Sequence, residues 1–251
     1  MISRMAAPES SAERDPRTAA TPAPPTEYYA HSDAWAARGI LGALSARARR
    51  QMFAEFMNVF RPTPEDRVLD VGVTSDGDRR ESNLFEALYP FPYRVVGVGR
   101  QDLRAVGVAF PHARLVRGDG CHLPFATGSF DIVASHATIE HVGHRSAQAA
   151  FVRELLRVGR RCFITTPNRW FPLELHTFLP LVHYLPPPLH RRVLRGLGRR
   201  FYAEESNLNL LARREFRDLF PAGTHVAIRF SSLATNLLAF VEGERGAGVS
   251  R

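Results

Sequence analysis

The stretch RVLDVGVTSD, residues 67–76, decides how the rest of the sequence is interpreted. Residues 67–73 are apolar almost throughout, which is typical of a strand that is buried on both faces of a parallel sheet. Asp70 and Gly72 stand where a nucleotide-binding loop would begin. The glycines that a dinucleotide loop needs next are replaced by Thr74 and Asp76. The stretch therefore predicts a ligand-binding strand end without the usual phosphate-binding glycines.

Short β-branched runs and helix-like segments alternate on both sides of this strand. The strands that we expect are 67–73, 94–98, 113–116, 130–135 and 161–165, and the helices are 83–88, 102–106 and 147–158. A helix at 212–220 and two strands, 224–230 and 237–241, follow, and the strands should form a hairpin at the sheet edge. The pattern predicts an α/β fold of the Rossmann-like, doubly wound kind, mostly parallel, with an antiparallel closing strand.

Three segments lie outside this alternation. Residues 1–26 are rich in Ala, Pro, Ser and Thr and are expected to be a disordered tail before one domain, 27–251. Apolar residues recur at three- and four-residue spacings between 32 and 60, which predicts a helical N-terminal extension of one or two amphipathic helices. Residues 168–201 form an insertion after the fifth expected strand.

The bulk composition excludes several classes of protein. The net charge is +8, but all 33 basic residues are arginine, which indicates a compositional bias as much as selection for phosphate contacts. Two cysteines make no disulfide framework, so a reducing cytoplasm is the expected location. The sequence has no apolar run of membrane-spanning length and no secretory signal pattern.

The most specific motif is GDGCHLPFATGSFDIVASHATIEHV, residues 118–142. It resembles the D-A-x-x-L-P-F-x-x-x-S-F-D-x-V-x-S-x-x-x-L-E-H-V pattern of class I S-adenosylmethionine-dependent methyltransferases, in their small-molecule, type 11-like branch. The resemblance extends over about residues 60–170. It implies a methyltransferase that uses S-adenosyl-L-methionine. The acids near the first loop agree, because they would repel a pyrophosphate but not a cationic sulfonium.

The resemblance also assigns roles to individual positions. It implies that Asp119 accepts a hydrogen bond from the adenine amino group, that Gly120 and Cys121 line the ring, and that Ser135 lies near the sulfonium. The loop that receives the methionine end of the cofactor comprises Asp70, Val71, Gly72 and Thr74.

Two positions depart from the family pattern. Thr74 and Asp76 replace loop glycines, and the second strand ends in Gly99, where the family has an acid that grips the ribose hydroxyls. Asp102 lies three residues further on and is our candidate for that acid.

His136 and His141 are the candidate general bases, because imidazole suits proton removal from a hydroxyl near neutral pH. O-methylation is therefore slightly favoured over transfer to carbon or nitrogen. A metal ion is not expected, since His122, His136, His141 and His144 lack the partners and spacing of known zinc sites. Alignment of acceptor, methyl and sulfur can supply much of the rate without a base.

The insertion at 168–201 should carry the acceptor specificity. Its aromatic and apolar residues could form an apolar pocket for a small-molecule or lipid-like acceptor, and the arginines of 191–200 leave peripheral membrane contact open. A capping subdomain or dimer contact with solvated arginines is the plainer alternative. Nucleic acid is not expected as acceptor, since residues 135–138 read SHAT rather than an Asn/Asp-Pro-Pro-aromatic motif.

Rival functions remain at this point. One is a non-catalytic Rossmann-like binding protein that has lost productive cofactor geometry, which Thr74, Asp76 and Gly99 would suggest. Another is a basic membrane-surface or RNA-binding protein, whose affinity would fall steeply with salt. A nicotinamide-dependent oxidoreductase is less consistent with the loop. The sequence carries no signal for an oligomeric state.

Overall fold

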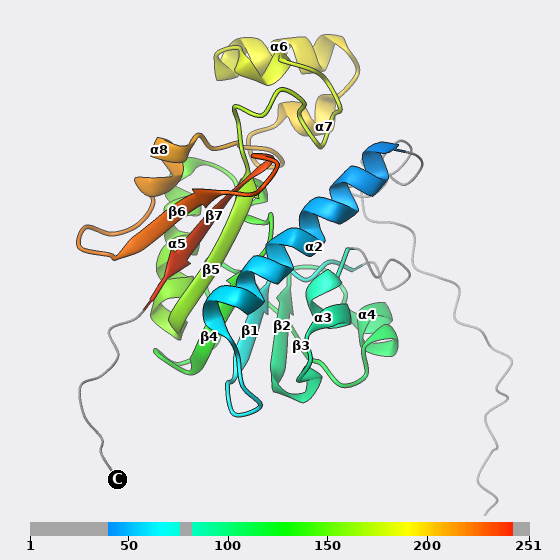
Figure 1. Cartoon of the computed structure of the whole chain (residues 1–251). Coiled ribbons are helices and arrows are strands. Elements are labelled where there is room, and N and C mark those ends of the chain that lie inside the picture. The colour runs from blue at the N-terminus through cyan, green and yellow to red at the C-terminus, as the bar shows by residue number, and fades with distance from the viewer. Residues whose placement is uncertain (1–39, 76–81, 243–251) are drawn as a thin grey trace, which may run out of the picture.

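A seven-stranded sheet in the order β3-β2-β1-β4-β5-β7-β6 forms the centre of this computed structural model, which describes residues 40–75 and 82–242 (Figure 1). The strands are β1 (Val68–Val71), β2 (Val95–Gly99), β3 (Arg114–Arg117), β4 (Phe130–Ser135), β5 (Gly159–Pro167), β6 (Val226–Phe230) and β7 (Asn236–Val241). β7 runs antiparallel to both of its neighbours, and the other pairs are parallel. The doubly wound fold with an antiparallel closing strand is confirmed.

Helices cover both faces of the sheet. The long helix α2 (Ile40–Phe60) and the short α3 (Leu84–Leu88) lie in front of it in Figure 1, and α5 (Arg145–Val158) lies behind it. α4 (Arg104–Ala109) connects β2 to β3, and α8 (Arg213–Arg217) precedes β6. On the α2 face, Phe56 is fully buried against Phe85 and Phe163. This aromatic packing stabilises the helical extension on the sheet, because buried apolar area is the main source of stability.

Most element boundaries agree with the sequence to within a few residues. β4 has the expected limits, whereas β5 extends two residues further at each end, because it pairs with β4 on one side and β7 on the other. The closing hairpin is also confirmed, but only β6 lies at the edge. The expected tail at 1–26 lies outside the described residues.

The segment between β5 and α8 extends beyond the carboxyl ends of the strands (Figure 1). It contains the 3-10 turn η3 (Val182–Tyr184), α6 (Pro187–Gly196) and α7 (Arg200–Ala203). Leu194, Tyr202, Ala203 and Leu208 form a small core of their own there. No helix in the described ranges is both long and apolar enough to span a bilayer.

The strand order reverses between β1 and β4, so that the loops after these two strands diverge. In open α/β sheets, ligands bind in the crevice at this point, at the carboxyl ends of the strands. The loops after β1, β2, β3 and β4 are therefore where a binding site is expected.

Candidate functional site

The chain leaves β1 through a loop that is held by both neighbouring strands. The carbonyl oxygen of Val71 accepts a hydrogen bond from Ser135 Oγ of β4 at 2.8 Å. The N–H groups of Gly72 and Val73 both donate to the carbonyl of Val98 in β2, at 2.9 and 3.0 Å. Gly72 has φ +122°, and a Cβ there would lie 2.0 Å from the Thr138 hydroxyl. Glycine is therefore required at position 72, since both the backbone angle and the space exclude a side chain.

Thr74 is held by hydrogen bonds to the side chain of Asn83, which comes just before α3. Its N–H and its hydroxyl both donate to Asn83 Oδ1, at 3.0 and 3.1 Å, and Asn83 Nδ2 donates back to the Thr74 carbonyl at 3.3 Å. A hydrogen-bonded clamp thus fixes the loop where the family uses a flexible glycine. Asp76, the other departure in this loop, lies outside the described residues.

Gly99, where the family has an acid, stands against the loop from β1. A Cβ at position 99 would lie 2.2 Å from the carbonyl oxygen of Val73, so this loop path leaves no room for any side chain. Asp102 does not replace the acid in this structure. It is exposed, its carboxylate accepts from Arg104 Nε at 2.8 Å, and it does not line the cavity described next.

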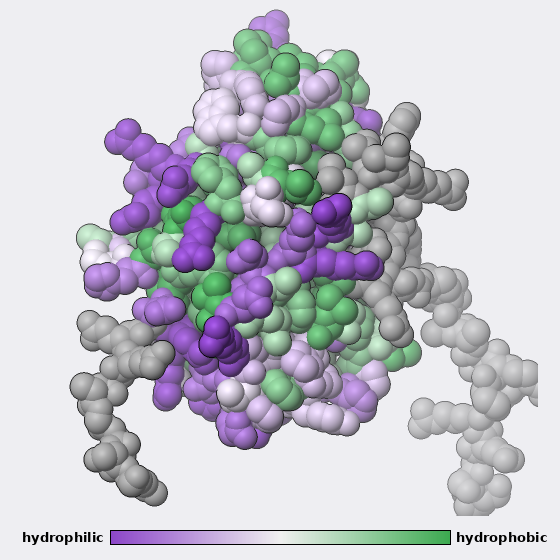
Figure 2. Space-filling model, in the orientation of Figure 1, coloured by the Kyte–Doolittle hydropathy of each residue, from purple (hydrophilic) through white to green (hydrophobic). Residues whose placement is uncertain are grey.

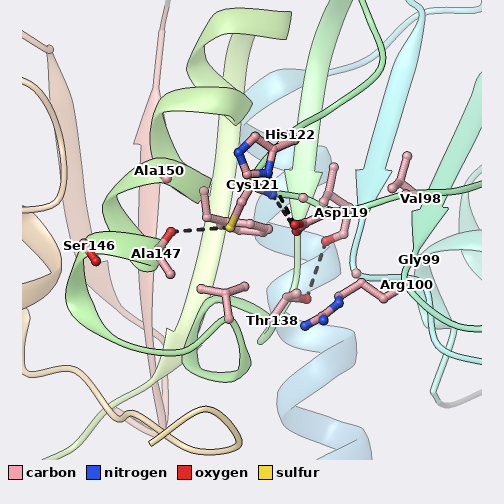
Figure 3. Close-up of a pocket in the computed structure, with 16 residues that line it drawn as sticks. Val98, Gly99, Arg100, Asp119, Cys121, His122, Thr138, Ser146, Ala147 and Ala150 are labelled. Atoms are coloured by element: carbon pink, nitrogen blue, oxygen red, sulfur yellow. Dashed lines mark hydrogen bonds and ion pairs between the residues drawn. The ribbon is translucent and has the colours of Figure 1, made fainter.

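A cavity of about 400 Å³ opens at the carboxyl ends of β1, β2 and β3 (Figure 3). Its lining contains five of the residues expected from the sequence: Val71, Gly72, Asp119, Gly120 and Cys121. Others were not anticipated: Val98, Gly99, Arg100, Gly118, His122, Thr138, Val142, Ser146, Ala147, Ala150 and Phe151. Six expected site residues do not line it: Asp70, Thr74, Asp102, Ser135, His136 and His141.

Asp119 places a carboxylate in this cavity (Figure 3). Its Oδ1 accepts from the Cys121 N–H at 3.0 Å, and its Oδ2 lies 3.4 Å from His122 Nδ1. The Cys121 N–H lowers the pKa of Asp119, so the side chain is ionised near neutral pH. About half of the Asp119 side chain is exposed. It can therefore accept a hydrogen bond from a ligand's amino group.

Gly120 and the following turn are packed tightly on α5. A Cβ at Gly120 would lie 2.4 Å from the ring of Phe151, so only glycine lets the turn approach the helix. Glu154 Oε2 accepts from the Leu123 N–H at 2.8 Å, and Arg157 donates to the carbonyls of Leu123 and Phe125. These contacts involve the backbone of the Leu-Pro-Phe part of the motif, and they anchor the cavity wall to α5.

The comparisons with known proteins agree with this geometry. Residues 85–161 match a family model described as a methyltransferase domain. This part of the chain is similar to class I S-adenosylmethionine-dependent methyltransferases. The similarity indicates S-adenosyl-L-methionine as the cofactor. No curated protein sequence matches this chain.

Solved structures share its fold at low sequence identity. The PH0226 protein of Pyrococcus horikoshii OT3 superposes with a TM-score of 0.56 at 15% identity, over 87% of this chain and 99% of that one. The putative methyltransferase in a complex with the Haloferax volcanii Trm112 activator gives 0.52 at 14%, over 87% and 98%. Magnesium protoporphyrin IX methyltransferase of Synechocystis PCC 6803, with bound SAH, gives 0.50 at 14%, over 82% and 89%.

The cavity fits S-adenosyl-L-methionine, the cofactor that the family similarity indicates. Its volume is within the usual range of about 300–1,000 Å³ for small-ligand sites. An ionised acid, Asp119, stands at one wall, and Gly72, Gly99 and Gly120 are part of the lining. When bound, the cofactor supplies the activated methyl group, and the protein must align an acceptor with it.

A second group of ionisable residues lies beside the cavity, on the α3 side of the sheet. Asp70 and Glu86 are buried, and His136 Nδ1 lies 3.8 Å from Asp70 Oδ1. Burial raises the pKa of both acids, and the charge of Asp70 adds to the effect at Glu86. The ring of His136 packs between Phe85 and Phe163, and burial lowers its pKa to about 4. His136 is therefore neutral at pH 7.

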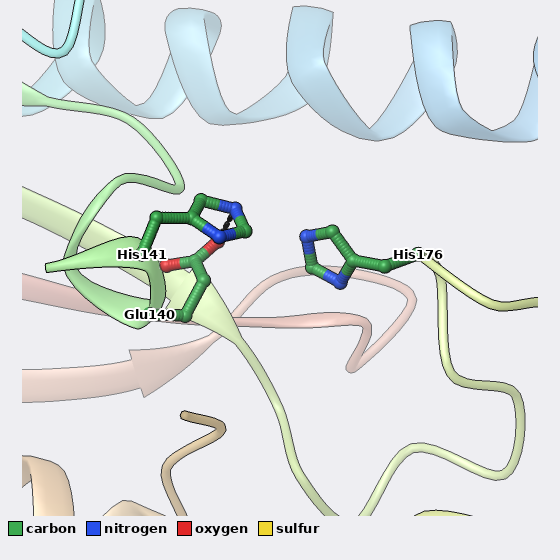
Figure 4. A group of neighbouring side chains, drawn as sticks. All are labelled: Glu140, His141 and His176. Atoms are coloured by element: carbon green, nitrogen blue, oxygen red, sulfur yellow. Dashed lines mark ion pairs between the residues drawn. The ribbon is translucent and has the colours of Figure 1, made fainter. Parts of the chain in front are cut away.

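A third group unites two segments that are far apart in the sequence (Figure 4). Glu140 and His141 belong to the 3-10 turn η2 (Ile139–His141), and His176 comes from the loop after β5. One ligand atom from each lies within 4.8 Å of the other two. In the sequence, His141 stands near His122, His136 and His144, and no spacing signal points to His176.

Restoring the family acid at the end of β2 should weaken cofactor binding. Gly99→Asp forces a side chain against the Val73 carbonyl, so the loop must move. We expect the Kd for S-adenosylhomocysteine, measured by calorimetry, to rise about tenfold or more, together with a loss of stability of about 1–3 kcal/mol. Gly107→Asp, where a Cβ meets only Leu115 at 3.8 Å, is the control and should bind normally. Tighter binding by Gly99→Asp would show that the loop tolerates the acid.

The buried, neutral His136 should make folding stability depend on pH. The unfolded chain takes up a proton on this histidine below about pH 6.5, whereas the folded form does so only below about 4. Stability should therefore fall as the pH drops from about 6.5 to 4, by about 1–3 kcal/mol from this group. In His136→Phe, urea unfolding across that range should show a shallower pH dependence. The same slope in both proteins would contradict this prediction.

Proposed function

We propose that the methyltransferase transfers its methyl group to a hydroxyl oxygen of a small-molecule or lipid-like acceptor. The observation that carries the cofactor part of the proposal is the position of Asp119, an ionised and half-exposed carboxylate in the wall of the cavity. Asp119 would accept a hydrogen bond from the adenine amino group, and Gly120 and Cys121 would line the ring. A neutral cofactor without an amino donor would gain nothing from this acid.

The methionine end would lie against Val71, Gly72 and Thr138. The N–H groups of Gly72, Val73 and Thr74 already have hydrogen-bond acceptors within the protein, so they are not available to the cofactor carboxylate in this arrangement. Ser135 and Thr74 would act indirectly. Ser135 donates a hydrogen bond to the Val71 carbonyl, and Thr74 fixes the loop through its hydrogen bond to the side-chain amide of Asn83. Asp70 does not line the cavity and would act indirectly, as one of the two buried acids Asp70 and Glu86.

The acceptor would approach from the segment at 168–201, which we propose as the substrate cover. Large apolar side chains are exposed on it: Trp170, Leu181, Leu189 and Leu197. Figure 2 shows apolar surface over the end of the molecule that carries α6. An exposed apolar patch on a protein surface indicates an interaction site. It supports an apolar or lipid-like acceptor, or contact of this end with a membrane surface.

The arginines of this segment support a nucleic-acid acceptor less well. Arg191 Nη1 lies 3.2 Å from Glu205, and Arg195 Nη2 lies 3.2 Å from Glu204. Pairing with acids of the same chain reduces the positive potential that phosphate binding requires. The high net charge is therefore weaker support for RNA binding than it was from the sequence alone.

For a hydroxyl acceptor we favour His136 of the two candidate bases, neither of which lines the cavity. Its ring nitrogens are buried without a hydrogen-bond partner among the described residues, and Asp70 lies beside Nδ1. The Nδ1 of His141 lies 2.7 Å from the Asn207 carbonyl, and burial lowers the His141 pKa to about 3. With such low pKa values either histidine is a weak base, so alignment of the acceptor would supply most of the rate.

Cofactor binding tests the first part of the proposal. We expect wild-type protein to bind S-adenosylhomocysteine in calorimetry and Asp119→Ala to bind about 10–100-fold more weakly, because a hydrogen bond to a charged group contributes about 1.5–3 kcal/mol. Asp102→Ala is the matched control, since that acid lies outside the cavity, and it should bind within about twofold of wild type. Absence of binding by wild type would contradict the methyltransferase proposal, whereas binding without methyl transfer to any acceptor would favour the non-catalytic alternative.

Methyl transfer to defined acceptors tests the second part. With isotope-labelled cofactor, we expect label in hydroxylated small molecules or lipids and none in transfer RNA. Trp170→Ala should lower kcat/KM about tenfold, the effect of losing ~1.4 kcal/mol of aromatic contact, without changing cofactor affinity. Tyr93→Ala removes an exposed aromatic from η1 (Pro92–Arg94), at the opposite end of β2, and should have no effect. Label in RNA alone would overturn the acceptor class.

A further inference from the structure

The cluster of Glu140, His141 and His176 has the donor set of a metal site. Figure 4 shows the two imidazole rings as near neighbours, at an interplanar angle of 83°, with the Glu140 carboxylate beside His141. Glu140 Oε1 lies 3.8 Å from His141 Nε2, and the ring centroids of the two histidines are 4.9 Å apart. Two imidazoles and one carboxylate are the three protein ligands of many zinc sites that keep a fourth position open.

In both histidines, one ring nitrogen has a hydrogen-bond partner outside the cluster, as is usual for metal-bound histidines. His176 Nδ1 lies 2.6 Å from Glu174 Oε1, which directs the opposite nitrogen, Nε2, toward the cluster (Figure 4). His141 Nδ1 lies 2.7 Å from the Asn207 carbonyl, so the proton is on Nδ1 and Nε2 carries the lone pair. A carboxylate or carbonyl behind each histidine is the usual outer shell of a metal-bound imidazole.

The carboxylate of Glu140 supplies an independent observation. Its Oε2 accepts from the Thr166 hydroxyl at 3.0 Å. Its Oε1 is buried and has no hydrogen-bond partner within the described part of the chain, and the residue is 0% exposed. A buried oxygen without a hydrogen-bond partner carries a free-energy cost. A purely structural polar cluster would leave that cost in place, whereas a cation bound between the three side chains would remove it.

We propose that Glu140, His141 and His176 bind one divalent metal ion of the zinc class. Bonds of about 2.0–2.2 Å would bring the ligand atoms to about 3.3 Å from one another, so the side chains must close by up to about 1.5 Å. The ion links η2, which follows β4, to the loop after β5. Its fourth position takes a water molecule or an oxygen of a bound molecule. Metal binding does not depend on the acceptor proposed above, since its readout is bound metal.

The site lies next to the cofactor cavity without being part of it. Thr138 and Val142, on either side of η2, line the cavity, while Glu140 and His141 face the loop that carries His176. The metal therefore fixes the turn that separates the cavity from the segment 168–201. This position allows metal binding and cofactor binding to be measured separately on the same protein.

Metal content tests the proposal directly. Tag-free full-length protein is treated with a chelator, dialysed, incubated with zinc and desalted, and zinc is counted by mass spectrometry. We expect about one zinc per chain in wild type and in His144→Gln, an exposed histidine near η2 but outside the cluster. His176→Gln and Glu140→Gln should lose it. Calorimetry with S-adenosylhomocysteine shows whether each variant is folded.

Two further measurements do not depend on ligand variants that could misfold. Wild-type protein loaded with cobalt(II) should show visible absorption distinct from that of the aqueous ion, because N and O ligands of low symmetry replace water. Glu174→Gln, which keeps all three ligands, should weaken zinc binding about 10–100-fold. Wild type that binds no more zinc than His176→Gln, or an aqueous cobalt spectrum, would overturn the proposal.

Discussion

The short stretch in which the chain leaves β1 is the constraint on which the binding site depends. Strand β4 holds the Val71 carbonyl through the Ser135 hydroxyl, and β2 holds the next two N–H groups through the Val98 carbonyl. With its neighbours on both sides fixed, the backbone at Gly72 adopts a positive φ and comes into contact with Thr138. These contacts are made within the protein and stabilise one wall of the cavity, which is the kind of preorganisation that favours binding.

The same stretch explains why the loop departs from its family pattern. Because the Val73 carbonyl lies against the end of β2, this loop path leaves no room for a side chain at position 99. Because Thr74 is clamped by Asn83, the loop needs no further glycine to turn. Thr74 and Gly99 depart from the family pattern in the sequence, and both are explained by the path of this one loop.

The η2 turn connects this cofactor side to the rest of the protein. Gln148 of α5 donates to the carbonyls of Ile139 and Asn209, and the Asn209 N–H donates to the carbonyl of Glu140. The turn is therefore held by α5 and by the chain that returns from the segment 168–201. An ion at Glu140, His141 and His176 would add a third connection, between this turn and the loop after β5. The acceptor side and the cofactor side then share one structural element.

The sequence by itself determined the doubly wound sheet, the limits of β4, the closing hairpin and five residues of the cavity wall. Apolar strand runs and the Asp119–Phe125 motif are local patterns, so they can be read along the chain. Only the tertiary structure decided that Asp102 pairs with Arg104 away from the cavity, that Gly99 is a steric requirement, and that His176 meets Glu140 and His141. These depend on which segments pack together across the sheet, and a linear pattern carries no record of such distances.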